Sequence, residues 1–158
     1  MINYRIRKAL PRDIDELIRL CAEHAEYEQA EYSPNNKKQK LAKQLFSDNP
    51  KLYCFIVEGE SEILGYCTYT FDYSTWDADF FAYMDCLYLR PQARNFGIGE
   101  ELVKHIAKHS KQVNCKIIQW HTPNFNVRAI KFYHRIGATS KQKTRFYLND
   151  DAMLQLIK

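Results

Sequence analysis

The chain has 158 residues, 46% of them hydrophobic and 27% charged, which predicts one soluble globular domain over residues 1–158 with a single core. The net charge of +4 is scattered without a basic stripe, and no run approaches the ~18 apolar residues of a membrane helix, so nucleic-acid and membrane partners are not expected. Five cysteines without paired or metal-ligand spacing, in a chain whose start has no apolar signal region, predict reduced thiols in a cytoplasmic protein.

The first predicted elements are a strand and an amphipathic helix. Residues 3–8 alternate as a strand, and residues 11–13 open the helix. The apolar face of the helix consists of Ile14, Leu17, Ile18 and Cys21. The helix ends in an acidic and aromatic cluster that includes Tyr27 and Glu28. Glutamates at this density form either a solvated helix face or part of a binding site, and the residues alone leave both interpretations open.

The middle of the chain is predicted to add a lysine-rich helix over residues 35–46 and two strands, over residues 52–58 and 62–71. A polar loop over residues 72–79 follows, and it contains Trp76. A tryptophan on a loop between strands either covers the edge of the core or belongs to a binding surface, and the residues alone favour neither.

Residues 82–110 have the order strand, glycine loop, helix. Residues 82–89 are apolar or small apart from Asp85, which predicts a strand that is buried on both faces. Pro91 ends this strand. Gly97 and Gly99 then lead into a helix over residues 100–110, whose apolar stripe contains Leu102, Val103 and Ile106.

The two glycines have two interpretations. They form a tight turn, or they let the backbone close around a phosphate or pyrophosphate that binds the free amides at the helix start. The spacing matches neither the Rossmann fingerprint nor a P-loop. A carboxylate in so apolar a strand costs several kcal/mol unless it is paired or protonated, so Asp85 favours a functional site and, with it, the anion-binding loop.

The rest of the chain is predicted to contain strands over residues 116–122 and 144–148 and helices over residues 127–136 and 152–157, with Gly137 as a C-terminal cap. Together the elements predict a mixed, largely antiparallel sheet with helices on both faces. The five histidines, at positions 24, 105, 109, 121 and 134, fall in no ligand-spaced set, so no metal is expected.

The glycine loop resembles that of a known family. Arg94-x-x-Gly97-x-Gly99, after a strand that ends in Leu87-Tyr88-Leu89, resembles the acyl-CoA pyrophosphate motif of the GNAT N-acetyltransferases. Asn126 and residues 129–138 resemble the helix of that family that lies beside the CoA thiol. Within the superfamily the chain is most similar to the diamine (spermidine/spermine) and thialysine acetyltransferases. This likeness rests on Ile6, Arg7, Asp13, Tyr27, Glu28, Tyr73, Trp76, Arg145, Phe146 and Tyr147.

The resemblance implies an α/β (α+β) acyl-CoA N-acyltransferase fold, a homodimer and acetyl-CoA as cosubstrate. In this fold the central strands of a mostly antiparallel sheet splay apart to admit the pantetheine. The backbone N–H of Leu87 would donate to the thioester carbonyl. The implied cofactor-binding residues are Leu87, Tyr88, Leu89, Arg94, Asn95, Phe96, Gly97, Ile98, Gly99 and Asn126.

By the same resemblance, Asp85 and Tyr133 are the catalytic residues. Asp85 matches a glutamate of the diamine enzymes and is expected on the same strand face as Leu87, where it would take a proton from the substrate ammonium directly or through water. Tyr133 would protonate the departing thiolate, although the residues alone favour a core aromatic. The implied amine-binding residues are Tyr27, Glu28, Trp76 and Asp85.

Two departures from the diamine enzymes predict a smaller substrate. Residues 141–143 and Ser74 occupy positions that are acidic in those enzymes. We therefore expect acetyl transfer to the primary amine of a small molecule, such as a short diamine or a thialysine-like amino acid. The alternatives are a non-catalytic acyl-CoA sensor, against which the intact set of Asp85, Asn126 and Tyr133 speaks, and acetylation of a protein N-terminus or lysine.

Overall fold

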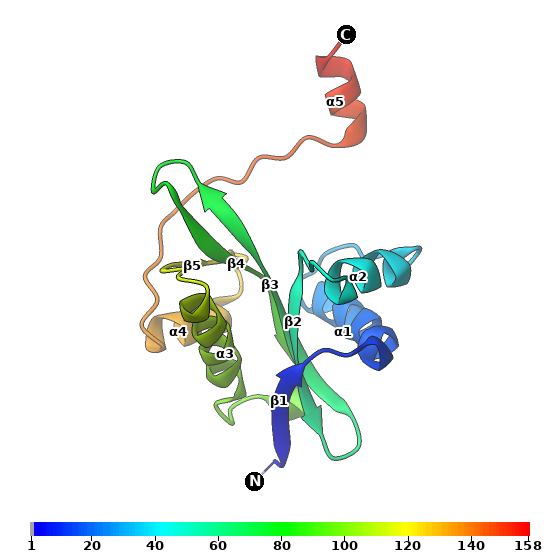
Figure 1. Cartoon of the computed structure of the whole chain (residues 1–158), viewed down its shortest axis with the longest axis vertical. Coiled ribbons are helices and arrows are strands. Elements are labelled where there is room, and N and C mark those ends of the chain that lie inside the picture. The colour runs from blue at the N-terminus through cyan, green and yellow to red at the C-terminus, as the bar shows by residue number, and fades with distance from the viewer. Residues whose placement is uncertain (1) are drawn as a thin grey trace. The chain divides into compact units, whose positions relative to one another are not determined.

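The computed structural model describes residues 2–158, which form two units, one that ends at Asn126 and one that spans Val127–Lys158. A five-stranded sheet in the order β1-β2-β3-β4-β5 is the centre of the first unit (Figure 1). Its strands are β1 (Tyr4–Lys8), β2 (Tyr53–Gly59), β3 (Ile63–Ser74), β4 (Asp79–Leu89) and β5 (Ile118–Gln119). The first four are antiparallel and β5 is parallel to β4, which confirms the predicted mixed, mostly antiparallel sheet.

Helices cover both faces of this sheet, as the sequence predicts (Figure 1). The helices α1 (Ile14–Tyr27) and α2 (Lys37–Phe46) lie on one face, where Leu17 and Leu20 pack against Ile56. The helix α3 (Ile98–Gln112) lies on the other face and contacts the neighbouring residue Phe55 through His105. Successive residues of a strand point to opposite faces, so β2 alone supplies side chains to both layers. Short 3₁₀ turns, Pro11–Asp13 and Pro91–Ala93, precede α1 and α3.

An ion-pair network joins β1 to the start of α1. The Asp13 carboxylate accepts two hydrogen bonds from the Arg7 guanidinium, at 2.6 and 2.8 Å, and a third from the Leu10 amide at 2.7 Å. Arg7 also donates to Glu58 on β2 at 2.8 Å. Asp13 is buried, so this pairing fixes the direction in which α1 leaves the sheet.

Strand β4 contains a β-bulge at Asp85. Thr68 pairs with Cys86 and Tyr69 with Met84, which leaves Asp85 as the extra residue of β4. The prediction of a strand buried on both faces is wrong here, because the Asp85 side chain is exposed. A bulge also interrupts the alternation of side chains, so the expectation that Asp85 and Leu87 share a strand face does not follow from their spacing.

The strands β4 and β5 separate soon after they meet. Among the described residues, β5 pairs with β4 only at Ala82 and Tyr83, so it is much shorter than the strand predicted over residues 116–122. The half of β4 from Met84 to Leu89 therefore has β3 on one side and no paired strand on the other. This arrangement agrees with the predicted splaying of the central strands.

The second unit contains two helices, α4 (Val127–Arg135) and α5 (Asp150–Leu156). Gly137, at a φ of 91°, ends α4 as predicted, since a side chain is strained in this left-handed conformation. The strand predicted over residues 144–148 is not present. A strand needs a neighbour for its backbone hydrogen bonds, and this unit contains no other extended segment paired with it. No helix in the described part of the chain is long and apolar enough to span a membrane.

Candidate active site

The unpaired edge of β4 presents backbone groups to a ligand. The Arg90 amide donates to the Leu64 carbonyl at 2.9 Å, towards β3. Because backbone groups alternate between the two edges of a strand, the amides of Leu87 and Leu89 point the opposite way, towards the side from which β5 diverges. The geometry thus supports the predicted role of Leu87 as a donor to an acyl carbonyl.

The glycine loop presents the N-terminus of α3. The helix begins at Ile98, directly after Gly97, which has a left-handed φ of 79°. A Cβ at Gly97 would meet nothing within 4 Å, so the glycine is required by its backbone conformation and not by space. Gly97 is also the N-cap and has no side chain of its own to cap the helix, so the first amides of α3 and the positive end of the helix dipole suit an anion.

Arg94 lies between the two expected sites. Its Nε donates to the Leu89 carbonyl at 2.8 Å, and its guanidinium lies over the Tyr27 ring, 4.6 Å from the centroid, and 5.7 Å from the centroid of Tyr88. The residue expected to bind pyrophosphate is therefore turned towards the expected amine site. The Leu89 carbonyl, expected to pair with the pantetheine, already accepts this hydrogen bond.

Asp85 lies beside the Cys86 thiol. Its Oδ2 is 3.7 Å from the Cys86 Sγ. Burial and, second, the Asp85 charge raise the pKa of Cys86 to about 12, and burial also raises the pKa of Cys21. Both sulfurs are therefore neutral thiols at neutral pH, and neither is a nucleophile. Asp85 is the exposed base of this group, as proton transfer from a bound ammonium requires.

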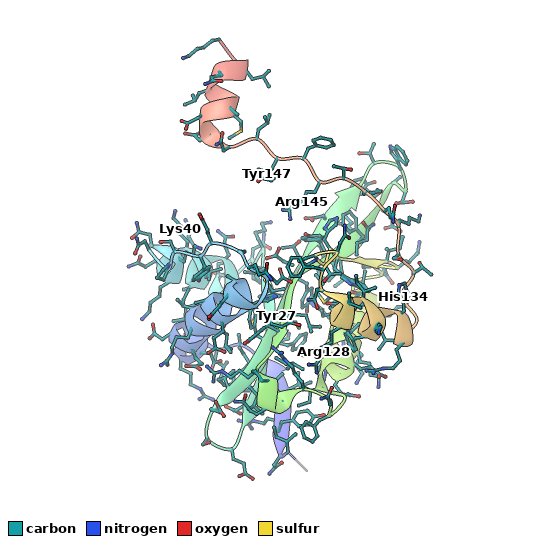
Figure 2. The ribbon with its side chains drawn as sticks, turned by 180° about the vertical axis from the view of Figure 1, so that it is seen from behind. Tyr27, Lys40, Arg128, His134, Arg145 and Tyr147 are labelled. Carbon is teal, nitrogen blue, oxygen red and sulfur yellow. The ribbon has the colours of Figure 1, made fainter. Side chains whose placement is uncertain are left out.

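The end of α1 brings two more predicted residues to the same place. In Figure 2, Tyr27 extends from the end of α1 towards the sheet. Its ring centroid is 6.3 Å from that of Tyr88, and its hydroxyl donates to Asn126 Oδ1 at 3.4 Å. Glu28 follows as the C-cap residue of α1. The structure therefore groups Tyr27, Glu28, Tyr88, Arg94 and Asn126 around the C-terminal half of β4.

A clamp at Arg90 holds α1 against this part of the sheet. The Arg90 guanidinium pairs with Glu16 and Glu23 of α1, at 2.7 and 2.6 Å, and with Glu62 at 2.9 Å. Its side chain is 14% exposed, so these charges are partly withdrawn from water. The clamp therefore ties α1 to the residue that follows β4. It was not predictable from the sequence, because the partners are 28 to 74 residues apart along the chain.

Sequence analysis also missed His24. The histidine is buried on α1, with its Nδ1 3.2 Å from the Tyr66 hydroxyl and its Nε2 3.4 Å from Glu28 Oε1. A signal was present, because position 24 continues the apolar stripe of Ile14, Leu17 and Cys21. A histidine at a core position, four residues before a candidate substrate-binding glutamate, indicates a pair across one helical turn.

Two further predicted residues belong to other elements of the chain. Trp76 is 99% exposed, in the turn between β3 and β4. It is separated from Asp85 by most of a strand length, roughly 20 Å at 3.3 Å per residue. Tyr133 belongs to α4 of the second unit, where its carbonyl accepts the Ala138 amide at 3.0 Å. The roles assigned to Trp76 and Tyr133 stay predictions.

The group of residues on β4, α1 and α3 has the parts that acyl transfer needs. There are amides for an anion, an unpaired strand edge for an extended ligand and an exposed carboxylate for a proton. The described residues include no cluster of three or more histidine, cysteine, aspartate or glutamate side chains that could hold a metal ion.

Comparisons with known proteins identify the family. The model of the acetyltransferase (GNAT) family matches residues 13–138. The thialysine N-epsilon-acetyltransferase of Mus musculus is 29% identical over 157 residues, covering 94% of this chain and 92% of the mouse protein. That of Bos taurus is 30% identical over 141 residues, covering 84% and 82%.

A solved structure has the same fold. An aminoglycoside N-acetyltransferase in complex with CoA has a TM-score of 0.79 at 15% identity, with 95% of this chain and 97% of that chain covered. The predicted fold is thereby confirmed, and so is the predicted likeness to the thialysine acetyltransferases. Because the family model covers most of the sequence and includes the β4 strand, the glycine loop and α4, this chain belongs to the acetyltransferase (GNAT) family.

Proposed function

We propose that this protein transfers the acetyl group of acetyl-CoA to a primary amine of a small molecule, either a short diamine or a thialysine-like amino acid. The observation that supports it most is the exposed Asp85 carboxylate at the bulge of β4, beside the unpaired strand edge that includes Leu87. The thialysine acetyltransferases among its relatives supply the substrate class.

Acetyl-CoA fits the residues of the site. The amides at Gly97, Ile98 and Gly99, at the start of α3, suit a pyrophosphate, and the outward amides of Leu87 and Leu89 suit the carbonyl groups of an extended pantetheine. In this assignment, Tyr88, Arg94, Asn95, Phe96 and Asn126 complete the cofactor site. The start of α3 and the outward amides of β4 support this assignment, and Arg94 would have to turn from Tyr27 to reach a pyrophosphate.

The reaction is a direct attack. Asp85 accepts a proton from the substrate ammonium, and the free amine attacks the thioester carbonyl carbon, whose oxygen accepts a hydrogen bond from the Leu87 amide. The C–N bond forms and the C–S bond breaks. Tyr133 gives its hydroxyl proton to the departing thiolate and regains a proton from the nitrogen, which loses its second proton as the amide forms, while Asp85 releases the first proton to solvent. Tyr27 and Glu28 bind the remainder of the amine.

We also propose that the two units are parts of a single domain, because the family match runs across their boundary from residue 13 to residue 138. We propose a cytoplasmic homodimer as well. The free state of all five cysteines and the 99% exposure of Trp76 support this assignment. Light scattering of the purified protein tests the dimer, and replacement of Trp76 by serine should shift it towards the monomer.

Thiol release from acetyl-CoA tests the activity. Thialysine, 1,3-diaminopropane, 1,4-diaminobutane, spermine and a lysine-containing peptide are offered separately, with the amine-free reaction as the blank. We expect release with the first three and little with spermine or the peptide. Calorimetric binding of CoA without turnover of any amine supports a sensor. Turnover of the peptide alone supports a protein acetyltransferase, and absence of both binding and turnover removes the assignment.

A further inference from the structure

His24 is enclosed by aromatic side chains of the sheet. Its ring stacks on Tyr88 with centroids 5.3 Å apart and meets the edge of Tyr66 at 6.1 Å. The residue is 9% exposed. The imidazole is therefore fixed by packing on both sides, and its two nitrogens are the only polar atoms of the side chain that need partners.

The partners of these nitrogens determine the tautomer. A carboxylate only accepts hydrogen bonds, so the Nε2 that lies 3.4 Å from Glu28 Oε1 is the nitrogen that bears the hydrogen. The Nδ1 of a neutral imidazole then accepts, and the Tyr66 hydroxyl at 3.2 Å donates to it. The result is a chain of hydrogen bonds from β3, through His24, to the end of α1.

The charge on His24 supports this arrangement. Burial lowers the pKa of His24, and the carboxylates of Glu28 and Asp85 oppose that shift, so the imidazole is neutral at physiological pH. His24 lies between the end of α1 and strand β4: its Nε2 is 3.4 Å from Glu28 Oε1, and its ring stacks on Tyr88, three residues after Asp85.

Glu28 is the C-cap residue of α1, and its backbone is held there, because its amide donates to the His24 carbonyl at 2.9 Å and the Ala30 amide donates to the Ala25 carbonyl at 2.9 Å. The partner that the structure shows for its side chain is His24. Tyr66 is a buried side chain of a central strand. A hydrogen bond from the fixed imidazole therefore transfers the rigidity of the sheet to a carboxylate at a helix end.

We propose that His24 is a positioning residue of the amine site: it holds the Glu28 carboxylate beside Asp85, so that the two acids together bind a substrate with two cationic nitrogens. This inference rests on the proposed function. Asp85 receives the proton of the reacting nitrogen, and Glu28 pairs with the second one. His24 touches neither nitrogen and acts through Glu28.

Three replacements of His24 separate positioning from packing. Glutamine reaches the depth of Nε2 and keeps an N–H donor for Glu28, so His24→Gln should keep the KM for 1,3-diaminopropane within about threefold. Asparagine is too short and leucine has no donor, so His24→Asn and His24→Leu should raise that KM roughly tenfold, the loss expected for one hydrogen bond. The KM for acetyl-CoA should stay unchanged in all three. An equal rise in His24→Gln overturns the proposal.

A double-mutant cycle tests whether His24 acts through Glu28. Glu28→Gln should raise the KM for 1,3-diaminopropane, and adding His24→Asn should raise it no further. Additive effects overturn the proposal. The matched control is His109→Asn, because His109 on α3 makes the same kind of bond, from its Nδ1 to the Tyr69 hydroxyl at 2.6 Å, on the other face of the sheet. It should lower stability and leave both KM values unchanged.

A further test needs no activity. Long-range ¹H–¹⁵N spectra of the free protein should show His24 as the neutral Nε2–H tautomer, and the Nδ1–H tautomer overturns the proposal, because Nε2 then has no hydrogen for Glu28. If wild-type protein acetylates no amine, the proposed function fails while this spectrum still reports on the hydrogen bonds. If it acetylates amines and the His24 variants match wild type, the inference about His24 alone fails.

Discussion

The Arg94 guanidinium lies over the Tyr27 ring, 4.6 Å from its centroid, and so joins the proposed cofactor site to the proposed amine site. A cation on an aromatic face occupies the position in which Tyr27 would otherwise meet a substrate ammonium. Binding of a pyrophosphate at the start of α3 attracts the same guanidinium. Cofactor binding should therefore release Tyr27 for the amine.

This competition predicts coupling between the two ligands. In wild-type protein, saturating CoA should lower the Kd of 1,3-diaminopropane about two- to fivefold, as expected for one cation–π contact. In Arg94→Ala the coupling should disappear, and CoA itself should bind more weakly. Tyr27→Phe keeps the ring and should keep the coupling. NMR titration of the protein with 1,3-diaminopropane, with and without CoA, measures this change in Kd. Undiminished coupling in Arg94→Ala would contradict competition between Arg94 and the amine for Tyr27.

Asp85→Asn removes the proposed base. Turnover at neutral pH should fall by roughly 10²- to 10⁴-fold, the usual contribution of a positioned general base, while the affinity for CoA stays close to that of wild type. The rise of kcat with pH should move upwards, because the reaction then depends on the small fraction of free amine, whose pKa is near 10. A pH–rate profile that superimposes on the wild-type curve would remove Asp85 from this role.

Tyr133→Phe removes the proposed acid. Loss of the hydroxyl should slow acetyl transfer by roughly 10- to 1,000-fold, with little change in the KM for either substrate. An acetyl donor with a better leaving group tests whether Tyr133 acts as an acid, because a departing thiol of lower pKa needs less protonation by an acid. The defect should therefore shrink with an activated acetyl thioester, and an equal defect with both donors would indicate a structural role.

The pairing of Asp13 with Arg7 predicts how stability depends on pH. Hydrogen bonds from Arg7 lower the pKa of Asp13, and hydrogen bonds from Arg7 and then Arg5 lower the pKa of Glu58 to about 2. A carboxyl whose folded pKa is lowered stabilises the fold above its unfolded pKa, near 4, and loses that contribution as the pH falls through its folded value. The midpoint temperature of thermal unfolding should therefore fall as the pH is lowered from about 4.5 towards 2.

The matching variants separate this network from an ordinary surface pair. Asp13→Asn removes one of the two carboxylates that pair with the partly buried Arg7 guanidinium and should cost about 2–3 kcal/mol of unfolding free energy at pH 7, with a weaker dependence on acid. Asp79→Asn disrupts the exposed pair with Lys116 and should lower the free energy of unfolding far less, because solvent screens an exposed pair. Urea unfolding at pH 7 and pH 3 gives both values, and similar losses in the two variants would argue against the special role of Asp13.

Local patterns predicted the elements that their own residues determine. The helix of residues 98–112 and the hairpin strands follow from apolar periodicity, and Gly97 and Gly137 are required by left-handed backbone conformations. The bulge at Asp85 was not predictable, because it depends on how β3 and β4 are paired. The strand expected over residues 144–148 failed for a related reason, since alternation indicates a strand but does not supply its neighbour.

The site was predictable only in part. The residues of the motif were found by their order along the chain, and the structure brings Tyr27, Asp85, Arg94 and Asn126 to one region of the first unit. The hydrogen bonds that hold this region together join residues far apart in the sequence: His24 and Tyr66 are 42 residues apart, and Arg90 and Glu23 are 67 residues apart. Such contacts depend on tertiary packing, and spacing along one chain gives no measure of it.

The early end of β5 affects how the protein behaves in concentrated solution. Backbone groups of β4 beyond Tyr83 face the side on which β5 diverges, and a strand edge of this kind is a template for aggregation with other extended chains. A pantetheine that lines this edge covers it. Samples stored with CoA should therefore stay clear on heating at temperatures where ligand-free samples turn turbid.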